Sequence, residues 1–179
     1  MVNLWTATIH TDTATLIAKC VHFALGTIAI AVASITIAGF LLIKSRKTQS
    51  LLLLAAVSGN ALFVATIKTI TQVIRPENQI LHVASFSYPS GHCAGAIVFI
   101  GLLTYYIWLK WGSGQRIKIL STAIFGLVVA FVSFDRIYLN VHWLSDVIGG
   151  CLLGAFWLSF CVIFYERLKR DNNVDSQSV

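Results

Sequence analysis

The sequence is poor in charged residues: Asp, Glu, Lys and Arg make up only 11% of its 179 residues. Soluble domains carry about 25%. Hydrophobic residues make up 57% of the chain, and no amphipathic pattern remains that would give a helix a solvated face. The composition therefore weighs against a helical bundle in water and predicts an integral membrane protein.

The sequence also lacks clustered cysteines and an early basic segment. Its four cysteines form neither a metal-binding cluster nor a disulfide spacing, so they are expected to be small buried side chains. Residues 1–18 contain no Lys or Arg, so the n-region of a signal peptide is not expected there. We expect residues 1–19 to lie at the membrane–water interface on the extracytoplasmic side, with Trp5 as an anchor.

Five apolar stretches contain no charged residue: 23–43, 50–67, 93–109, 119–134 and 147–165. A bilayer core about 30 Å thick needs about 20 helical residues, with a lower limit of about 17. The third and fourth stretches are at or below this limit, so we expect either that polar flanks extend them or that they lie next to a thinned, protein-lined region. The prediction is an all-α, polytopic membrane bundle of five transmembrane helices. It forms one domain over residues 20–170, and a disordered cytoplasmic tail follows at 171–179.

Basic residues follow alternate apolar stretches, and would all lie on one side of the membrane. They are Lys44, Arg46 and Lys47 after the first, Lys110, Arg116 and Lys118 after the third, and Arg167, Lys169 and Arg170 after the fifth. The positive-inside rule makes this side cytoplasmic and predicts a cytoplasmic C-terminus in the plasma (inner) membrane. Because topology accounts for the formal charge of +6, no nucleic-acid partner is expected.

The opposite ends of these stretches carry ionisable side chains, which are expensive at membrane depth and so suggest function. Lys68 and Arg75 are seven residues apart, close to two helical turns. This spacing predicts that they share one face of the second helix, which Pro76 would end. Converging cations of this kind point to an anionic ligand.

Two further motifs open the third and fifth helices. Pro89-Ser90-Gly91-His92 offers an N-cap residue in Ser90, and Gly91 lets a ligand approach the backbone. Free N–H groups at such a helix end favour phosphate. His142 and Asp146 are four residues apart, so the carboxylate can fix the tautomer of the imidazole.

These motifs together resemble the three-part signature of the type 2 phosphatidic acid phosphatase (PAP2) superfamily. The blocks are Lys68-x6-Arg75-Pro76, Pro89-Ser90-Gly91-His92 and Arg136-x5-His142-x3-Asp146, and the resemblance covers roughly residues 20–168. It implies that His142 is the nucleophile and forms a phosphohistidine, that Asp146 orients it, and that His92 is the general acid. It also implies a phosphate clamp of Lys68, Arg75 and Arg136, to which Ser90 and Gly91 add hydrogen bonds, and it implies no metal or cofactor.

The resemblance implies an integral membrane lipid phosphatase whose site faces the extracytoplasmic side. Polyprenyl pyrophosphate is the favoured substrate, followed by phosphatidylglycerophosphate or phosphatidate. Two histidines that begin in opposite protonation states predict a bell-shaped pH profile.

The sequence departs from the family pattern in two places. Asp135 stands where the third block often has serine, and the chain has five predicted spans where bacterial lipid members usually have six. A carboxylate at position 135 would oppose an anion unless it turns away or pairs with a cation. A weakened family member therefore stays an alternative, as does a small transporter or lipid-binding protein that uses the same charged cluster. The oligomeric state is left open.

Overall fold

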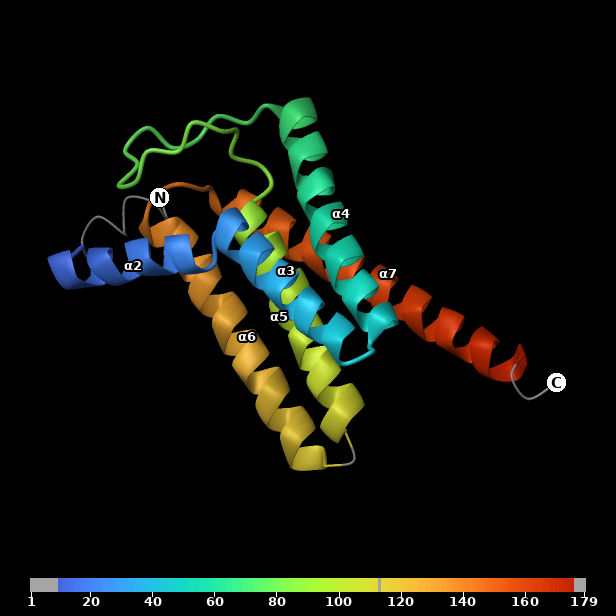
Figure 1. Ribbon diagram of the computed structural model, residues 1–179. Helices are drawn as coiled ribbons and strands as arrows, with labels where there is room; N and C mark the ends of the chain where they lie inside the picture. Colours follow the sequence, from blue (N-terminus) through green and yellow to red (C-terminus); the bar gives the residue numbers. More distant parts are fainter. Residues whose placement is uncertain (1–9, 113, 176–179) are drawn as a thin grey trace.

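The fold is a bundle of helices, seen in a computed structural model that describes residues 10–112 and 114–175 (Figure 1). The helices are α2 (Asp12–Ala24), α3 (Thr27–Ile43), α4 (Lys47–Thr71), α5 (Gly91–Trp111), α6 (Gln115–Tyr138) and α7 (Leu144–Asp175). No strand occurs within the described residues. The predicted all-α class is confirmed.

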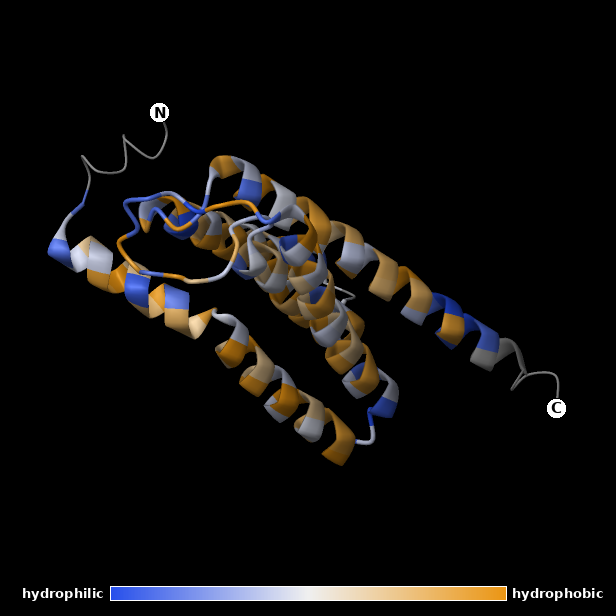
Figure 2. Cartoon of the chain, turned by 90° about the horizontal axis from the view of Figure 1, so that it is seen from above, coloured by the Kyte–Doolittle hydropathy of each residue, from blue (hydrophilic) through white to orange (hydrophobic). Residues whose placement is uncertain are grey.

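Four helices, α4 to α7, are each long and apolar enough to cross a membrane. Helices α2 and α3 meet at a bend of 47° and would make a fifth span if counted together. Large apolar side chains in the spans face outward: Leu127, Leu152 and Phe156 are 71%, 67% and 67% exposed. Figure 2 shows the helices dominated by hydrophobic residues. Outward-facing side chains of this kind are what lipid contact requires.

The third and fourth predicted stretches belong to helices longer than the apolar windows themselves. Helix α5 extends through Lys110 to Trp111, and α6 begins at Gln115 and includes Arg116 and Lys118. The polar flanks therefore lengthen both spans, as expected, because charged side chains at the ends of a span can reach the interface.

Helix α5 is the centre of the bundle and contacts α3, α4, α6 and α7. Small residues allow the close crossing with α7: a Cβ atom added at Gly154 would lie 2.8 Å from the carbonyl oxygen of Ala94. Membrane helices commonly approach through such small residues, since packing has to replace the hydrophobic effect. This packing fixes the N-terminus of α5 against α7, where the polar motifs lie.

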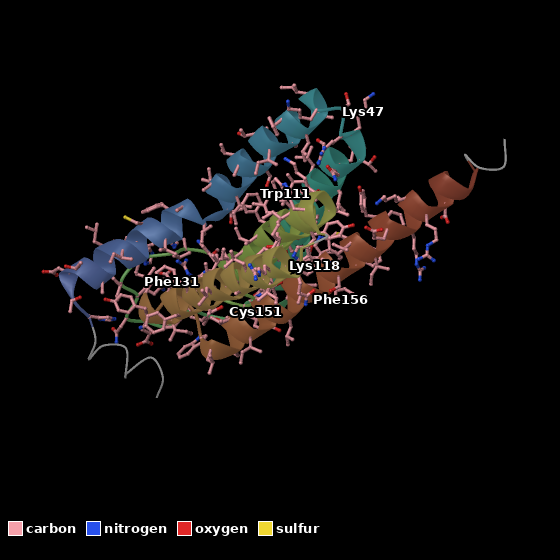
Figure 3. The ribbon with its side chains drawn as sticks, turned by 90° about the horizontal axis from the view of Figure 1, so that it is seen from below. Lys47, Trp111, Lys118, Phe131, Cys151 and Phe156 are labelled. Atoms are coloured by element: carbon pink, nitrogen blue, oxygen red, sulfur yellow. The ribbon has the colours of Figure 1, made fainter. Side chains whose placement is uncertain are left out.

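The two ends of the bundle differ in character. The long loop between α4 and α5, the connection between α6 and α7, and the C-terminal end of α2 gather at one end (Figure 1). The turns between α3 and α4 and between α5 and α6 lie at the other end. Lys47, at the start of α4, and Lys118, near the start of α6, follow these two turns and are labelled in Figure 3, which views the molecule from below. The three signature blocks therefore share one end of the bundle, away from these basic turns.

The predicted domain limits do not coincide with helix ends. The boundary at residue 19 falls inside α2, and α7 continues to Asp175, so residues 171–175 of the expected disordered tail are helical. A helix of this length carries its final turns beyond the apolar stretch. Residues 1–9, with Trp5, and residues 176–179 lie outside the described part of the chain, so the division into interfacial segment, domain and tail stays a prediction.

Candidate active site

The first signature block is split between a helix and a loop. Helix α4 ends at Thr71 because Gln72 takes the left-handed conformation, with φ 50° and ψ 31°. Lys68 is in the last turn of α4, whereas Arg75 lies beyond the helix. The prediction that the two residues share a helix face is therefore wrong, because the helix stops well before Pro76.

Lys68 and Arg75 nevertheless converge on one short segment of the α4–α5 loop. Lys68 Nζ donates to the carbonyl oxygens of Phe86 and Ser87, the latter at 3.0 Å. Arg75 donates from Nε to the Ser85 carbonyl at 2.7 Å and from Nη2 to the Phe86 carbonyl at 3.2 Å. Burial lowers the pKa of Arg75 to about 10, so its guanidinium is still charged at neutral pH. Backbone carbonyls thus hold both cations in place.

His142 lies between Arg75 and Asp146 and is only 2% exposed. Its Nε2 is 3.2 Å from Arg75 Nη1, and its Nδ1 is 3.4 Å from Asp146 Oδ2. A guanidinium can only donate, so Nε2 is the acceptor and the proton of the neutral ring is on Nδ1, facing the carboxylate. Burial is the main cause that lowers the pKa of His142 to about 4, so the ring is neutral at pH 7.

Asp146 connects His142 to the start of α7. Its Oδ2 accepts a hydrogen bond from the backbone N–H of Trp143 at 2.8 Å and another from the hydroxyl of Ser87. The N–H of Asp146 in turn donates to the Trp143 carbonyl at 3.0 Å, the backbone bond that closes the first turn. His142 precedes the first residue of α7, Leu144, so it sits in the connection rather than on the helix.

The second block forms the N-terminus of α5. Ser90 occupies the N-cap position and is fully buried, but its side chain makes no capping hydrogen bond. Its backbone N–H donates to the carbonyl of Asp146 at 2.9 Å, which joins the second and third blocks. Gly91 begins the helix, and the Nε2 atom of His92 lies 3.2 Å from the carbonyl oxygen of His22 on α2.

The third block places Arg136 deeper than expected. Its side chain is completely buried; Nη2 pairs with the carboxylate of Asp135, and Nη1 is 2.7 Å from Nδ1 of His22. Asp135 therefore pairs with a cation, one of the two arrangements that make a carboxylate compatible with a nearby anion.

A cavity of about 360 Å³ brings most of these residues together. Its wall includes Lys68, Arg75, Gly91, His92 and His142, all predicted, together with His22. Arg136 and Ser90 are not part of its wall, and Asp146 lies behind His142. Among the described residues that line it there is no carboxylate. The cavity is therefore suited to an anion.

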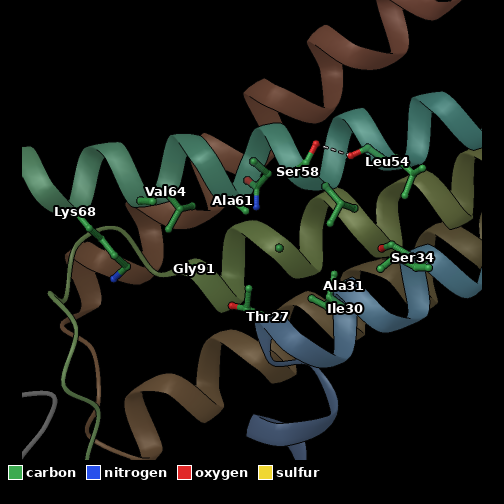
Figure 4. A pocket seen from close by; sticks show the side chains of 15 residues that line it. Thr27, Ile30, Ala31, Ser34, Leu54, Ser58, Ala61, Val64, Lys68 and Gly91 are labelled. Atoms are coloured by element: carbon green, nitrogen blue, oxygen red, sulfur yellow. Dashed lines mark hydrogen bonds between the residues drawn. The ribbon is translucent and has the colours of Figure 1, made fainter. Parts of the chain in front are cut away.

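A second, mainly apolar groove of about 530 Å³ adjoins this cavity between α3 and α4. The two share Thr27, Val64, Lys68 and Gly91 in their walls. Figure 4 shows the groove running from Lys68 past Val64 and Ala61 along α4, opposite Ala31 and Ser34 of α3. A charged pocket that continues into an apolar groove matches an amphiphilic ligand.

Sequence reasoning missed His22 and Ser87. His22 belongs to no motif and comes into the site only because α2 folds across the end of α5. Ser87 carries only a weak signal, the close spacing of three serines at positions 85, 87 and 90.

Residues 49–170 match the PAP2 superfamily. The chain belongs to this family. It is 32% identical to phosphatidylglycerophosphatase B of Bacillus subtilis over 127 residues, covering 70% of this chain and 63% of that protein. Identity to an undecaprenyl-diphosphatase of Sulfolobus acidocaldarius is 40% over 86 residues, covering 45% of this chain and 34% of that protein.

The fold is also similar to that of a solved PAP2 protein, a transmembrane phosphatidylglycerolphosphate phosphatase from Bacillus subtilis. The TM-score is 0.87 at 23% identity, covering 94% of this chain and 85% of the other. The match with the curated relatives covers less than two thirds of their length. The family and the fold of this chain are thus established.

Proposed function

We propose that this protein is an integral membrane lipid phosphatase that hydrolyses a lipid phosphate or pyrophosphate through a phosphohistidine at His142. The observation that carries the proposal is the orientation of the His142 ring. Its Nδ1–H faces Asp146, and its Nε2 lone pair faces Arg75 at the cationic cavity. A neutral imidazole with an unprotonated Nε2 is the form that attacks phosphorus.

The reaction needs charge neutralisation, an in-line nucleophile and a proton for the leaving group. Lys68 and Arg75 supply positive charge at the cavity wall, and a guanidinium fits phosphate oxygens geometrically. A bound phosphate would take over the Arg75 donor that now contacts Nε2 of His142.

The chemical steps then follow from the two histidines. Nε2 of His142 forms a bond to phosphorus while the bond from phosphorus to the leaving oxygen breaks. Asp146 stabilises the imidazolium that results at His142. His92, which begins as the imidazolium, gives one proton to the leaving oxygen and becomes neutral, a contribution of about 10²–10⁴-fold. Water then attacks the phosphohistidine, His92 accepts its proton, and inorganic phosphate leaves.

The adjoining groove supports a lipid as substrate. A head group in the cavity would place its hydrocarbon chain between α3 and α4, against side chains such as Ile30 and Leu54. Among lipids we favour polyprenyl pyrophosphate, and next phosphatidylglycerophosphate or phosphatidate. Relatives named as an undecaprenyl-diphosphatase and a phosphatidylglycerophosphatase correspond to the first two of these lipids. We place the site at the extracytoplasmic face, because the basic turns lie at the other end of the bundle.

The test is phosphate release by the purified protein in detergent from these lipids and from diacylglycerol pyrophosphate, with His142→Ala alongside. We expect release by the wild-type protein, full activity in EDTA, and none by the variant. A transporter or a lipid-binding protein would release no phosphate from any lipid. Loss of activity in EDTA that Mg²⁺ restores would overturn the proposed cationic clamp.

A further inference from the structure

His22 lies in the wall of the cavity, whereas Arg136, which was expected to bind phosphate there, does not. His22 comes from the last turn of α2, and it lines the cavity together with Lys68, Arg75 and His92. Arg136 is 0% exposed and contacts His22 instead of the cavity. The one contact of Arg136 with a residue of the cavity wall that its hydrogen bonds provide is therefore the contact with the imidazole of His22.

The hydrogen bonds of Arg136 determine the tautomer of His22. Arg136 Nη1 lies 2.7 Å from His22 Nδ1, and a guanidinium has only donors. His22 Nδ1 is therefore the acceptor, and the neutral ring carries its proton on Nε2. Within the described residues no hydrogen bond occupies this Nε2.

Two contacts fix the direction of the His22 ring. It packs against the ring of His92 with a centroid distance of 4.7 Å and an angle of 31° between the planes. On the other side, Nδ1 of the ring accepts the hydrogen bond from Arg136 Nη1 at 2.7 Å. These two contacts hold the His22 ring between the N-terminus of α5 and Arg136 of α6.

We propose that His22 is a phosphate-binding residue, which donates its Nε2–H to a phosphate oxygen while Arg136 polarises the ring from behind. This inference rests on the proposed function of the cavity. A donor whose opposite ring nitrogen accepts from a cation is strengthened, because hydrogen bonds in a chain polarise one another. The ring thereby carries part of the Arg136 charge to the ligand, although Asp135 neutralises that arginine directly.

The test compares two substitutions of His22, one that keeps a ring without an N–H donor and one that keeps an N–H donor without a ring. His22→Phe keeps a flat ring against His92 but removes the donor. His22→Gln loses the ring but places an amide N–H near the position of Nε2. We measure the KM for the lipid substrate, inhibition by vanadate as a phosphate mimic, and the melting temperature in detergent, with His82→Phe in the exposed α4–α5 loop as control.

For His22→Phe we expect KM and the vanadate inhibition constant to rise about 10-fold to 100-fold, the effect of one hydrogen bond to a charged group. His22→Gln should recover most of this loss, and His82→Phe should behave as wild type. Wild-type values for His22→Phe would overturn the proposal. Equal losses in both His22 variants, accompanied by a lower melting temperature, would assign His22 to packing alone.

These outcomes are separate from a failure of the proposed function. If the wild-type protein releases phosphate and His22→Phe matches it in KM and vanadate inhibition, only the role of His22 is wrong. If the wild-type protein neither releases phosphate nor binds vanadate, the proposed phosphatase function is wrong, and the proposed role of His22 is wrong with it.

Discussion

The two sides of the cavity hold their cations in different ways. On what we call the loop side, Lys68, Arg75 and His142 line the cavity, with Ser87 and Asp146 behind them. On what we call the helix side, His22 and His92 line it, with Asp135 and Arg136 behind them. On the loop side, backbone carbonyls orient two cations, Lys68 and Arg75, and no carboxylate of residues 10–112 or 114–175 forms an ion pair with either of them. On the helix side, Arg136 is paired with Asp135 and separated from the cavity by His22.

This difference bears on what each side contributes. A cation held by neutral carbonyls keeps its full charge for an incoming anion, and its position is fixed before the ligand arrives. A cation paired with a carboxylate mainly stabilises the fold and offers the ligand little net charge. We therefore expect the loop side to be the stronger part of the proposed phosphate clamp, and the helix side to support it.

The largest effect should come from the nucleophile on the loop side. We expect His142→Ala to lower the phosphate-release rate by about 10⁴-fold or more, because no neighbouring group can replace the attacking nitrogen. His82→Ala, in the exposed part of the α4–α5 loop, is the matched control and should be silent. A His142→Ala enzyme that keeps a tenth of the rate would mean that another residue attacks phosphorus.

Arg75→Lys should have the next largest effect. The substitution keeps the charge but removes the fork that contacts Ser85, Phe86 and His142. We expect kcat/KM to fall about 10²-fold to 10³-fold, because the planar fork both binds phosphate oxygens and is fixed by the loop. The same change at the exposed Arg116, at the far end of the bundle, should leave kcat/KM unaltered. Equal rates for wild type and Arg75→Lys would show that charge alone suffices.

Asp135→Asn tests the helix side, where stability should change more than catalysis. The substitution leaves the buried Arg136 guanidinium without its carboxylate, and breaking a buried pair costs about 3–5 kcal/mol. We expect a clearly lower melting temperature in detergent and a several-fold tighter inhibition by vanadate. Glu77→Gln, at an exposed loop position, controls for the loss of a negative charge. An unchanged melting temperature would contradict the buried pair.

The smallest effect concerns the acid side of the pH profile. The neutral form of His142 is the proposed nucleophile, and burial lowers its pKa from 6.5 to about 4, so the neutral form persists as the pH falls below 6.5. On this side kcat/KM should decline only as the pH approaches 4. We would measure kcat/KM for a soluble phosphate ester across this range. A decline centred at pH 6.5 would show that His142 is exposed to water.

The apolar stretches predicted the spans well, because hydrophobic length is a property of consecutive residues. The first stretch was the exception: residues 23–43 include the break between α2 and α3. The left-handed conformation of Gln72 was also unforeseen, since glutamine carries no marked preference for it. Placing Arg75 on the helix was a local error that left its predicted convergence with Lys68 intact.

Contacts across the bundle were harder to foresee. That Asp135 would pair with a cation was one of two open possibilities, and the choice depends on how deeply the end of α6 is buried. His22 lies 114 residues from Arg136 along the chain and has no motif around it. Only the folding of α2 over α5 brings it to the cavity, and this is tertiary information.

The hydrogen bonds of Asp146 have a consequence for heat sensitivity. One carboxylate both ties the opening turn of α7 through Trp143 and aligns the ring of His142. Fraying of that single turn would release the imidazole while the remainder of the bundle stays intact. Warming should therefore silence turnover before the helices melt, and cooling should restore it.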